Sequence, residues 1–445
     1  MFKRARFVFR LLEAIFVKYY LVMGIGSFIG IVTFVLAPRL MPFLPKLRTT
    51  QSIAVVGRFT QAEIPLAIQQ QISPGLTTLA PDGQVYPALA SSWKITDGNK
   101  TYVFTLDRTK KWHDGTTLKS RDLDYNFKDA IVEHPDDDTV VIRLTNTFSP
   151  LPVVLSRPIF KRGLVGAGDY KVTSLSKNGQ IVEALILTPV ATSSHLPKLK
   201  YLFYASDEQA RLAFKLGVAQ TIQEVSTSAD ILDWPNIKQT NQTHPDRYVG
   251  IFFNTRDPNF IGGDGKNLRL ALVYATDKSI YPNRVYGPIN PNSWAYNSEL
   301  KHFDQDFTRA KQLLTKVGKP PKILTISVTP AYLAISEAVK AHWHRLGIKV
   351  DTAVVPDVPN NFSVLIIAQA VPADPDQYNL WHSTQTDTNL TGLANPRIDK
   401  LLEDGRKSLD MQERKQIYLD FQKYLVEDVP VIFLFHPQTF TLTRN

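Results

Sequence analysis

The sequence predicts an α/β protein with two lobes, and three observations support this fold class. The chain has 445 residues, which is enough for two or three domains. Hydrophobic residues make up 44 % of the chain and aromatic residues 11 %, which indicates a sizeable core and argues against disorder. Short apolar runs also alternate with segments of helical periodicity, most clearly after residue 250. Such alternation is typical of α/β proteins.

The first 150 residues predict strands and two short helices. The run SIAVVG at 52–57 is apolar and ends in glycine, as a short buried strand does. Alternating β-favouring residues predict two more strands at 101–106 and 139–144. A helix is expected at 62–72, and the spacing of apolar residues predicts another at about 123–131.

The rest of the chain predicts a regular series of helices and strands. Ser206 is the expected N-cap of a helix at 206–216, because acids fill the first turn and a glycine follows the last. Asp410 with Glu413 resembles a capping box, which would open a helix that ends near residue 427. The remaining expected helices are 267–275, 308–317 and 331–346, and the remaining strands are 323–328, 348–354 and 431–435.

Positive charge is concentrated at the N-terminus. The formal net charge is +10, but residues 1–48 carry eight Lys or Arg and one acid, which leaves 43 basic and 40 acidic residues for the rest of the chain. A phosphate-binding surface needs an excess of basic side chains on the folded part. We therefore expect no nucleic-acid partner.

The run from Tyr19 to Pro38 holds twenty uncharged positions, which is the length that a helix needs to cross a bilayer. Five basic residues precede the run and three follow closely, so the positive-inside bias favours a cytoplasmic N-terminus. We expect a cytoplasmic basic segment at 1–18, a transmembrane anchor at 19–38 and a proline-containing linker at 39–50. The protein would then be a single-pass protein of the cell membrane, with its remaining chain extracellular or periplasmic. A cleaved signal peptide is the alternative interpretation.

The sequence offers little catalytic or metal-binding chemistry. It has no cysteine, which excludes disulfides, thiol nucleophiles and cysteine-bound metals. The usual motifs for zinc hydrolases, serine hydrolases, phosphate loops and dinucleotide binding are also missing. His342 and His344 lie two positions apart on a predicted helix and cannot share a metal, and Asp374-Pro375-Asp376 is typical of a loop. We predict no catalytic residue, no metal site and no cofactor.

The stretch Trp112-His113-Asp114-Gly115 combines residue types that occur in active sites, but it has a simpler interpretation. Asp-Gly is a turn dipeptide, and tryptophan is a common core anchor. We therefore expect a structural corner here.

The stretch YPALASSWKITDGNKTYVFTLDRTKKWHDGTTLKSRDLDYNF, residues 86–127, resembles the signature of the extracellular solute-binding proteins of family 5. These proteins are the peptide and nickel receptors of ABC importers. Further similar segments follow in the family's order and cover nearly all of the chain after residue 50. They are 166–172, 207–217, 253–260, 268–278, 303–318, 342–350, 373–383, 395–406, 411–427 and 428–437.

The resemblance implies a two-lobed, periplasmic-binding-protein-like clamp of type II, similar to cluster C, in which lobe closure encloses a ligand. Lobe I would span 51–252 with a small subdomain at about 74–160, and lobe II would span 253–430. Residues 431–445 would form a return strand, with a C-terminus shorter than in the family. The implied function is capture of an oligopeptide or a similar small solute by a monomer and its delivery to an ABC permease with its ATPase.

Two departures from the family pattern concern the ligand. Ser73-Pro74-Gly75-Leu76 stands where relatives usually carry Tyr-Glu-Gly-Leu, so one acidic pocket candidate is missing. Val371 stands where the peptide-binding members carry an aspartate that binds the α-ammonium group of the peptide. The candidate ligand-binding residues are Phe59, Asn254, Gln369, Val371, Asp374, Asp376, Tyr378 and Trp381.

Two other functions remain open at this point. A binding protein that no longer takes part in transport, such as a surface sensor, would have the same fold. A membrane-anchored hydrolase would need a nucleophile paired with a base, and the sequence shows no such ordered pair.

Overall fold

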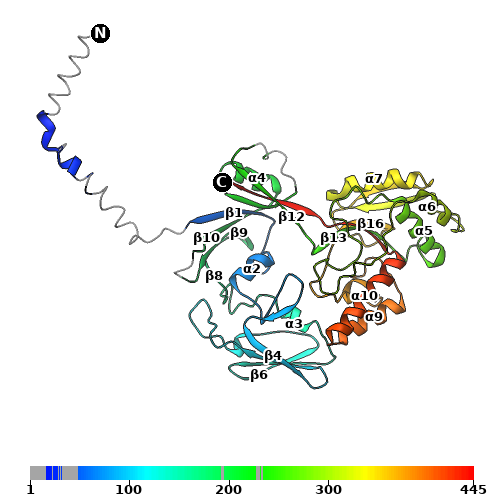
Figure 1. Ribbon diagram of the computed structural model, residues 1–445, viewed down its shortest axis with the longest axis horizontal. Coiled ribbons are helices and arrows are strands. Elements are labelled where there is room, and N and C mark those ends of the chain that lie inside the picture. The colour runs from blue at the N-terminus through cyan, green and yellow to red at the C-terminus, as the bar shows by residue number, and fades with distance from the viewer. Residues whose placement is uncertain are drawn as a thin grey trace, which may run out of the picture. The chain divides into compact units, whose positions relative to one another are not determined.

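The structure is a computed structural model that describes residues 17–22, 24–28, 30, 32, 49–191, 195–226, 231 and 234–444 (Figure 1). Residues 50–194 and 198–445 belong to one compact unit. All of the strands and helices discussed below lie in this unit.

The predicted transmembrane anchor, and with it the single-pass membrane location, is contradicted. In the part of the chain that the structure describes, no helix combines the length and the apolar character that crossing a bilayer requires. A span needs about 20 residues in one continuous helix, whereas the sequence criterion counted only uncharged positions. Much of the predicted anchor, most of segment 1–18 and most of linker 39–50 lie outside the described residues.

A seven-stranded sheet has the order β12-β18-β11-β1-β10-β9-β8. Side chains alternate across β1, so Ile53 packs with α2 on one face and Ala54 packs with α4 on the other. The predicted N-cap is confirmed, because the Ser206 side chain accepts from the Gln209 N–H at the start of α4. The elements are β1 (Thr50–Val56), α2 (Leu66–Ile72), β8 (Tyr170–Asn178), β9 (Ile181–Pro189), β10 (Lys198–Tyr204), α4 (Asp207–Lys215), β11 (Thr221–Val225), β12 (Ile237–Thr243) and β18 (Gln438–Arg444).

A four-stranded sheet of order β4-β5-β7-β6 has its own hydrophobic core. The helix predicted at about 123–131 is wrong, because residues 123–129 form a loop and a turn, and the chain from Ala130 onward pairs as strand β6 against β7. Exposed and half-buried residues alternate along β6, and Ile131 is 65 % exposed, so the apolar spacing did not mark a buried helix face. The elements are β2 (Thr77–Leu79), β3 (Val85–Pro87), β4 (Ala90–Thr96), β5 (Thr101–Leu106), η2 (Ser120–Asp122), β6 (Ala130–Asp136), β7 (Thr139–Leu144) and α3 (Leu151–Val154).

The Trp-His-Asp-Gly stretch is a structural corner, as predicted. Trp112 is 2 % exposed and donates from Nε1 to Asp122 across 2.8 Å. The His113 backbone N–H donates to the Gly166 carbonyl, and its Nε2 lies 2.9 Å from the Gly168 carbonyl oxygen. Gly115 has a φ of 86°, which a turn glycine adopts without strain. The corner therefore fastens the four-stranded sheet to the loop before β8.

A five-stranded sheet has the order β15-β14-β16-β13-β17, and α7 packs on its β14 and β15. Asp410 is the N-cap of α10, as predicted, but Glu413 accepts from Ser408 and does not complete a capping box. The elements are β13 (Arg247–Phe253), α5 (Gly262–Ala275), α6 (Phe307–Leu314), β14 (Ile323–Val328), η3 (Pro330–Tyr332), α7 (Leu333–His344), β15 (Lys349–Val354), β16 (Val364–Ala370), α8 (Tyr378–Trp381), α9 (Pro396–Lys407), α10 (Met411–Asp428) and β17 (Val431–Phe435).

The chain passes between the seven-stranded and the five-stranded sheet at two points in the described residues. It leaves the first sheet between β12 and β13 and returns between β17 and β18 (Figure 1). The lobe limits expected from the sequence stay predictions.

Candidate functional site

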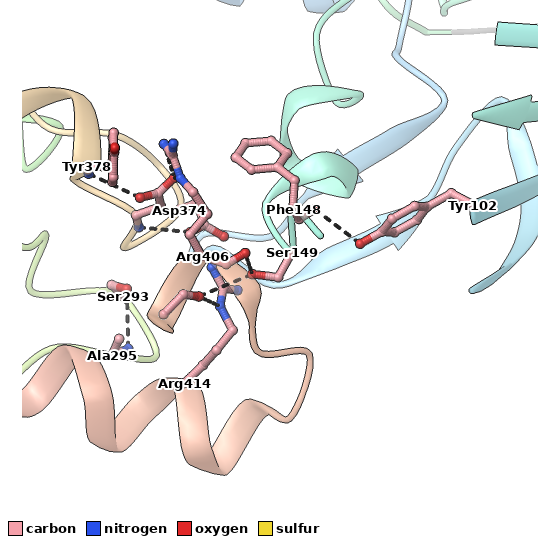
Figure 2. Close-up of polar contacts among 11 residues, drawn as sticks. Tyr102, Phe148, Ser149, Ser293, Ala295, Asp374, Tyr378, Arg406 and Arg414 are labelled. Carbon is pink, nitrogen blue, oxygen red and sulfur yellow. Dashed lines mark hydrogen bonds and ion pairs between the residues drawn. The ribbon is translucent and has the colours of Figure 1, made fainter. Parts of the chain in front are cut away.

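The loop after β16 holds two of the predicted ligand-binding carboxylates, and both pair with arginines. Figure 2 shows Asp374 together with Arg406 and Arg414. Asp374 is 6 % exposed and accepts from Arg414 across 2.7 Å. Burial raises the pKa of the Asp374 carboxyl, and the Arg414 guanidinium opposes the shift. The Arg414 Nε also donates to the Gly405 carbonyl across 2.9 Å. Asp374 is therefore part of a buried ion pair.

Asp376 is held in a similar way by Arg406. The two donors of Arg406, Nε and one terminal nitrogen, lie 3.1 and 2.9 Å from the same Asp376 oxygen. The Arg406 guanidinium also lies over the rings of Tyr378 and Phe148, at 4.0 and 5.3 Å from their centroids. Cation–π contacts of this kind stabilise a partly buried arginine. Asp376 thus has a cationic partner that holds its position.

The segment after β7 contacts this network through the end of α9 (Figure 2). The Ser149 N–H donates to the Arg406 carbonyl across 2.9 Å, and its Oγ lies 3.0 and 3.2 Å from the Arg406 and Gly405 carbonyl oxygens. The last carbonyls of a helix lack partners within the helix, so Ser149 supplies donors that α9 needs. These bonds join the four-stranded sheet's subdomain to α9.

A cavity of ≈ 310 Å³ lies beside the Asp374–Arg414 pair. Its lining is mainly apolar and aromatic and includes Trp93, Tyr102 and Trp294. The Tyr102 hydroxyl donates to the Phe148 carbonyl across 3.1 Å, and burial raises its pKa to about 12. The Tyr102 hydroxyl, Asp374 and Arg414 already have protein partners, so the cavity offers mostly apolar contact.

Gln369 and Val371 lie at the carboxyl end of β16, the central strand of the five-stranded sheet, and Asn254 follows the neighbouring strand β13. Val371 is half-buried against the core of this sheet, and its N–H donates to the Asp246 carbonyl across 2.7 Å. Gln369 is half-buried on β16. The Asn254 amide, just after β13, donates to the Phe362 carbonyl across 2.9 Å. The Val371 side chain therefore brings no charge to the carboxyl end of β16.

The three aromatic candidates occupy different places. Phe59 packs edge-on against Phe203 beside the seven-stranded sheet, with ring centroids 5.5 Å apart. Tyr378 stacks on His382 at 4.0 Å, and Trp381 is 2 % exposed. Trp381 is therefore a core residue in this structure. A ligand role for each of the eight candidates stays a prediction.

The described residues contain no group of three or more His, Asp or Glu side chains placed to hold a metal ion. Lys278, which follows α5, is a buried amine that the sequence did not reveal. Lys278 is 5 % exposed, and its Nζ donates to the Val273 and Thr276 carbonyls, both across 2.7 Å. The one signal in the sequence was its position directly after an apolar helix segment.

We expect the stability of this protein to rise between about pH 7 and pH 9 because of Lys278. Burial lowers the pKa of its ammonium group to about 7, and Arg284 adds to this effect. In the unfolded chain the pKa is about 10.4, so the unfolded state binds a proton that the folded state does not. The free energy of unfolding then rises by up to about 1.4 kcal/mol per pH unit.

Urea unfolding at a series of pH values measures this slope. Lys278→Met should remove it, whereas Lys340→Met, at a more exposed lysine on α7, should leave it unchanged. A Lys278→Met protein with the wild-type slope would contradict the assignment.

Residues 84–391, more than half of the chain, match the bacterial extracellular solute-binding proteins, family 5, over the middle region of that family. The chain is 25 % identical over 426 residues to the probable D,D-dipeptide-binding periplasmic protein of Escherichia coli (strain K12), with 80 % of each chain covered.

Solved structures of similar proteins share the fold. The ABC transporter substrate-binding protein CtaP of Listeria monocytogenes aligns with a TM-score of 0.75 and 21 % identity, over 89 % of this chain and 94 % of the other. NikZ of Campylobacter jejuni, in complex with Ni(L-His), aligns with a TM-score of 0.73 and 20 % identity, over 90 % and 94 %. These similarities confirm the two-domain α/β fold of periplasmic binding proteins. With the family match, they show that this chain belongs to the bacterial extracellular solute-binding proteins of family 5.

Proposed function

We propose that this protein captures a peptide or a similar small solute between two lobes and delivers it, as a monomer, to an ABC permease and its ATPase. In this proposal lobe I comprises the seven-stranded and four-stranded sheets, and lobe II comprises the five-stranded sheet with α5 to α10. The observation that carries the proposal is the family match over residues 84–391. The two strand crossings support it, because short connections between two sheets can act as hinges about which the sheets move as rigid bodies.

We further propose that the protein does not anchor the free α-ammonium group of a peptide at Val371. A buried ammonium group without a carboxylate partner costs several kcal/mol, and valine offers no such partner. Asp374 and Asp376 do not replace the missing charge, because Arg414 and Arg406 already bind them. Preferred ligands would be N-blocked or internal peptide segments, held through backbone hydrogen bonds near Gln369, or an uncharged solute.

Relatives with this fold differ in what their names say they bind. One is named for D,D-dipeptides, and another was solved with Ni(L-His). The fold by itself therefore does not identify the solute, and the side chains of the site must supply the specificity. Mass spectrometry of whatever co-purifies with the protein is the first step, because it identifies candidate solutes directly.

Calorimetry on a matched pair of peptides, one with a free N-terminus and one N-acetylated, tests the role of Val371. We expect the wild-type protein to show no preference for the free amine. Val371→Asp should create such a preference, because it places a carboxylate at the carboxyl end of β16. A tenfold preference corresponds to about 1.4 kcal/mol.

A wild-type preference of tenfold or more for the free amine would contradict this proposal. The variant Asp246→Asn would then test whether the Asp246 carboxylate binds the free amine. The Asp246 carbonyl accepts from the Val371 N–H, and its carboxylate is 57 % exposed. If neither peptide binds and a solute of another class co-purifies, peptides are excluded as the ligand, and the proposed solute-binding function still stands.

A further inference from the structure

The two connections between the sheets share an unusual sequence feature. The connection from β12 to β13 contains His244-Pro245, and the connection from β17 to β18 contains His436-Pro437. Both histidines are buried, at 5 % and 7 % exposure. Buried titratable groups at a joint between two sheets can couple its geometry to pH.

The two connections run side by side. Strands β12 and β18 pair up to Thr243 and Gln438, and β13 and β17 pair in the next sheet. Between these two ladders the His244 N–H donates to the Pro437 carbonyl across 3.0 Å. Proline has no N–H to donate, so the prolines weaken the backbone ladder at the joint.

The two imidazoles make contacts across the joint. His436 Nδ1 lies 2.7 Å from the Arg247 carbonyl oxygen, and His244 Nε2 lies 2.6 Å from the Thr439 hydroxyl oxygen. A carbonyl oxygen can only accept a hydrogen bond, so the neutral His436 carries its proton on Nδ1, and its Nε2 is unprotonated. Each imidazole therefore contacts the start of the strand that follows the other connection.

We propose that these paired connections form a pH-sensitive hinge, in which protonation of His436 loosens the joint between the seven-stranded and five-stranded sheets. This inference rests on the contacts of the joint, and it does not depend on the identity of the solute.

The charged groups on the first connection do not provide a free counter-ion. The Asp246 carboxylate lies 3.8 Å from His244 Nδ1, and it also pairs with Arg247 across 3.2 Å. The Asp246–Arg247 ion pair also lies near His436, whose Nδ1 donates to the Arg247 carbonyl. A proton on His436 therefore meets a carboxylate that an arginine already neutralises.

The loop on the other side of His436 provides no free carboxylate either. The Asn283 carbonyl accepts from the His436 N–H across 2.9 Å, and the next residue is Arg284. Arg284 pairs with Asp304 across 3.1 Å. Among the described residues no ion pair links a carboxylate to His436, so the imidazolium would be poorly compensated in the intact joint.

The direction of the pH effect follows from burial. Burial lowers the pKa of His436, while the Arg247 carbonyl and Asp246 partly oppose the shift. When the joint opens and water reaches the ring, its pKa returns toward about 6.5. The open joint then binds a proton that the intact joint does not, so a fall in pH favours opening, by up to about tenfold per pH unit.

Hydrogen exchange of the full-length protein, read by mass spectrometry, tests the hinge. Protection factors of peptides covering 240–250 and 430–440, corrected for intrinsic exchange rates, are compared at about pH 7.5 and about pH 5.5. We expect the wild type to lose up to about tenfold in protection at the lower pH. His436→Asn should keep its protection, because the asparagine amide donates to the Arg247 carbonyl from a similar position but does not titrate.

His342→Asn, on α7 and away from the joint, is the matched control and should keep the wild-type loss. Unchanged wild-type protection at the two pH values would overturn the proposal without any variant. An equal loss in His436→Asn would overturn it too. If that variant does not fold, His244→Gln provides the second test, because glutamine can keep the bond to Thr439 and should leave the wild-type loss intact.

Discussion

Replacing Arg414 by methionine should lower the free energy of unfolding by about 3–5 kcal/mol. Arg414 is 4 % exposed, and its removal leaves the Asp374 carboxylate buried without a cation. The change also removes the donor to the Gly405 carbonyl at the end of α9. Urea unfolding measures the loss, which should appear as a lower midpoint with an unchanged slope.

A double variant separates the unpaired charge from lost packing. Asp374→Asn together with Arg414→Met removes both charges, so the double variant should lose less stability than the sum of the two single variants. Lys400→Met breaks an exposed pair with Asp404 and should cause a far smaller loss. Additive single losses would show that the two side chains do not act as a pair.

Replacing Trp112 by alanine should destabilise the four-stranded subdomain by about 3–5 kcal/mol. The side chain is buried in the core of this subdomain, and its Nε1–H donates to a carboxylate oxygen of the half-buried Asp122 across 2.8 Å. Both the cavity and the lost hydrogen bond contribute to the cost. Thermal unfolding, monitored by the fluorescence of the other tryptophans, measures this loss of stability.

Two neighbouring changes serve as controls for the corner. Trp112→Phe keeps most of the ring volume and should cost less than the alanine variant. Asp114→Asn removes a charge that pairs with Lys161 near the surface, and it should leave stability nearly unchanged. A larger effect at Asp114 than at Trp112 would contradict the structural interpretation of the corner.

The elements that were predicted well depend on local sequence. The strands at 101–106, 139–144, 323–328 and 431–435 match the structure because their β-favouring residues and flanking turns act within a few positions. The caps at Ser206 and Asp410 are local for the same reason. The helix predicted at about 123–131 failed because the spacing of apolar residues does not reveal neighbours in space, such as β7, which pairs with Ala130 and Ile131.

The candidate site could be predicted only in part. The sequence identified the loop with Asp374 and Asp376, but it did not show that Arg414 and Arg406 neutralise them from α10 and α9. These partners lie 40 and 30 residues further along the chain. No pattern of local spacing reveals an ion pair of this kind.

The amino-acid sequence by itself determined the α/β class, the family and the absence of cysteine chemistry. These properties depend on composition and on motifs whose residues lie close together in the chain. Only the tertiary structure decided which carboxylates are already paired, that Lys278 is a buried amine, and that two His-Pro connections lie side by side. The physical reason is that burial and charge pairing are set by neighbours in space, and the fold brings those neighbours together from distant parts of the chain.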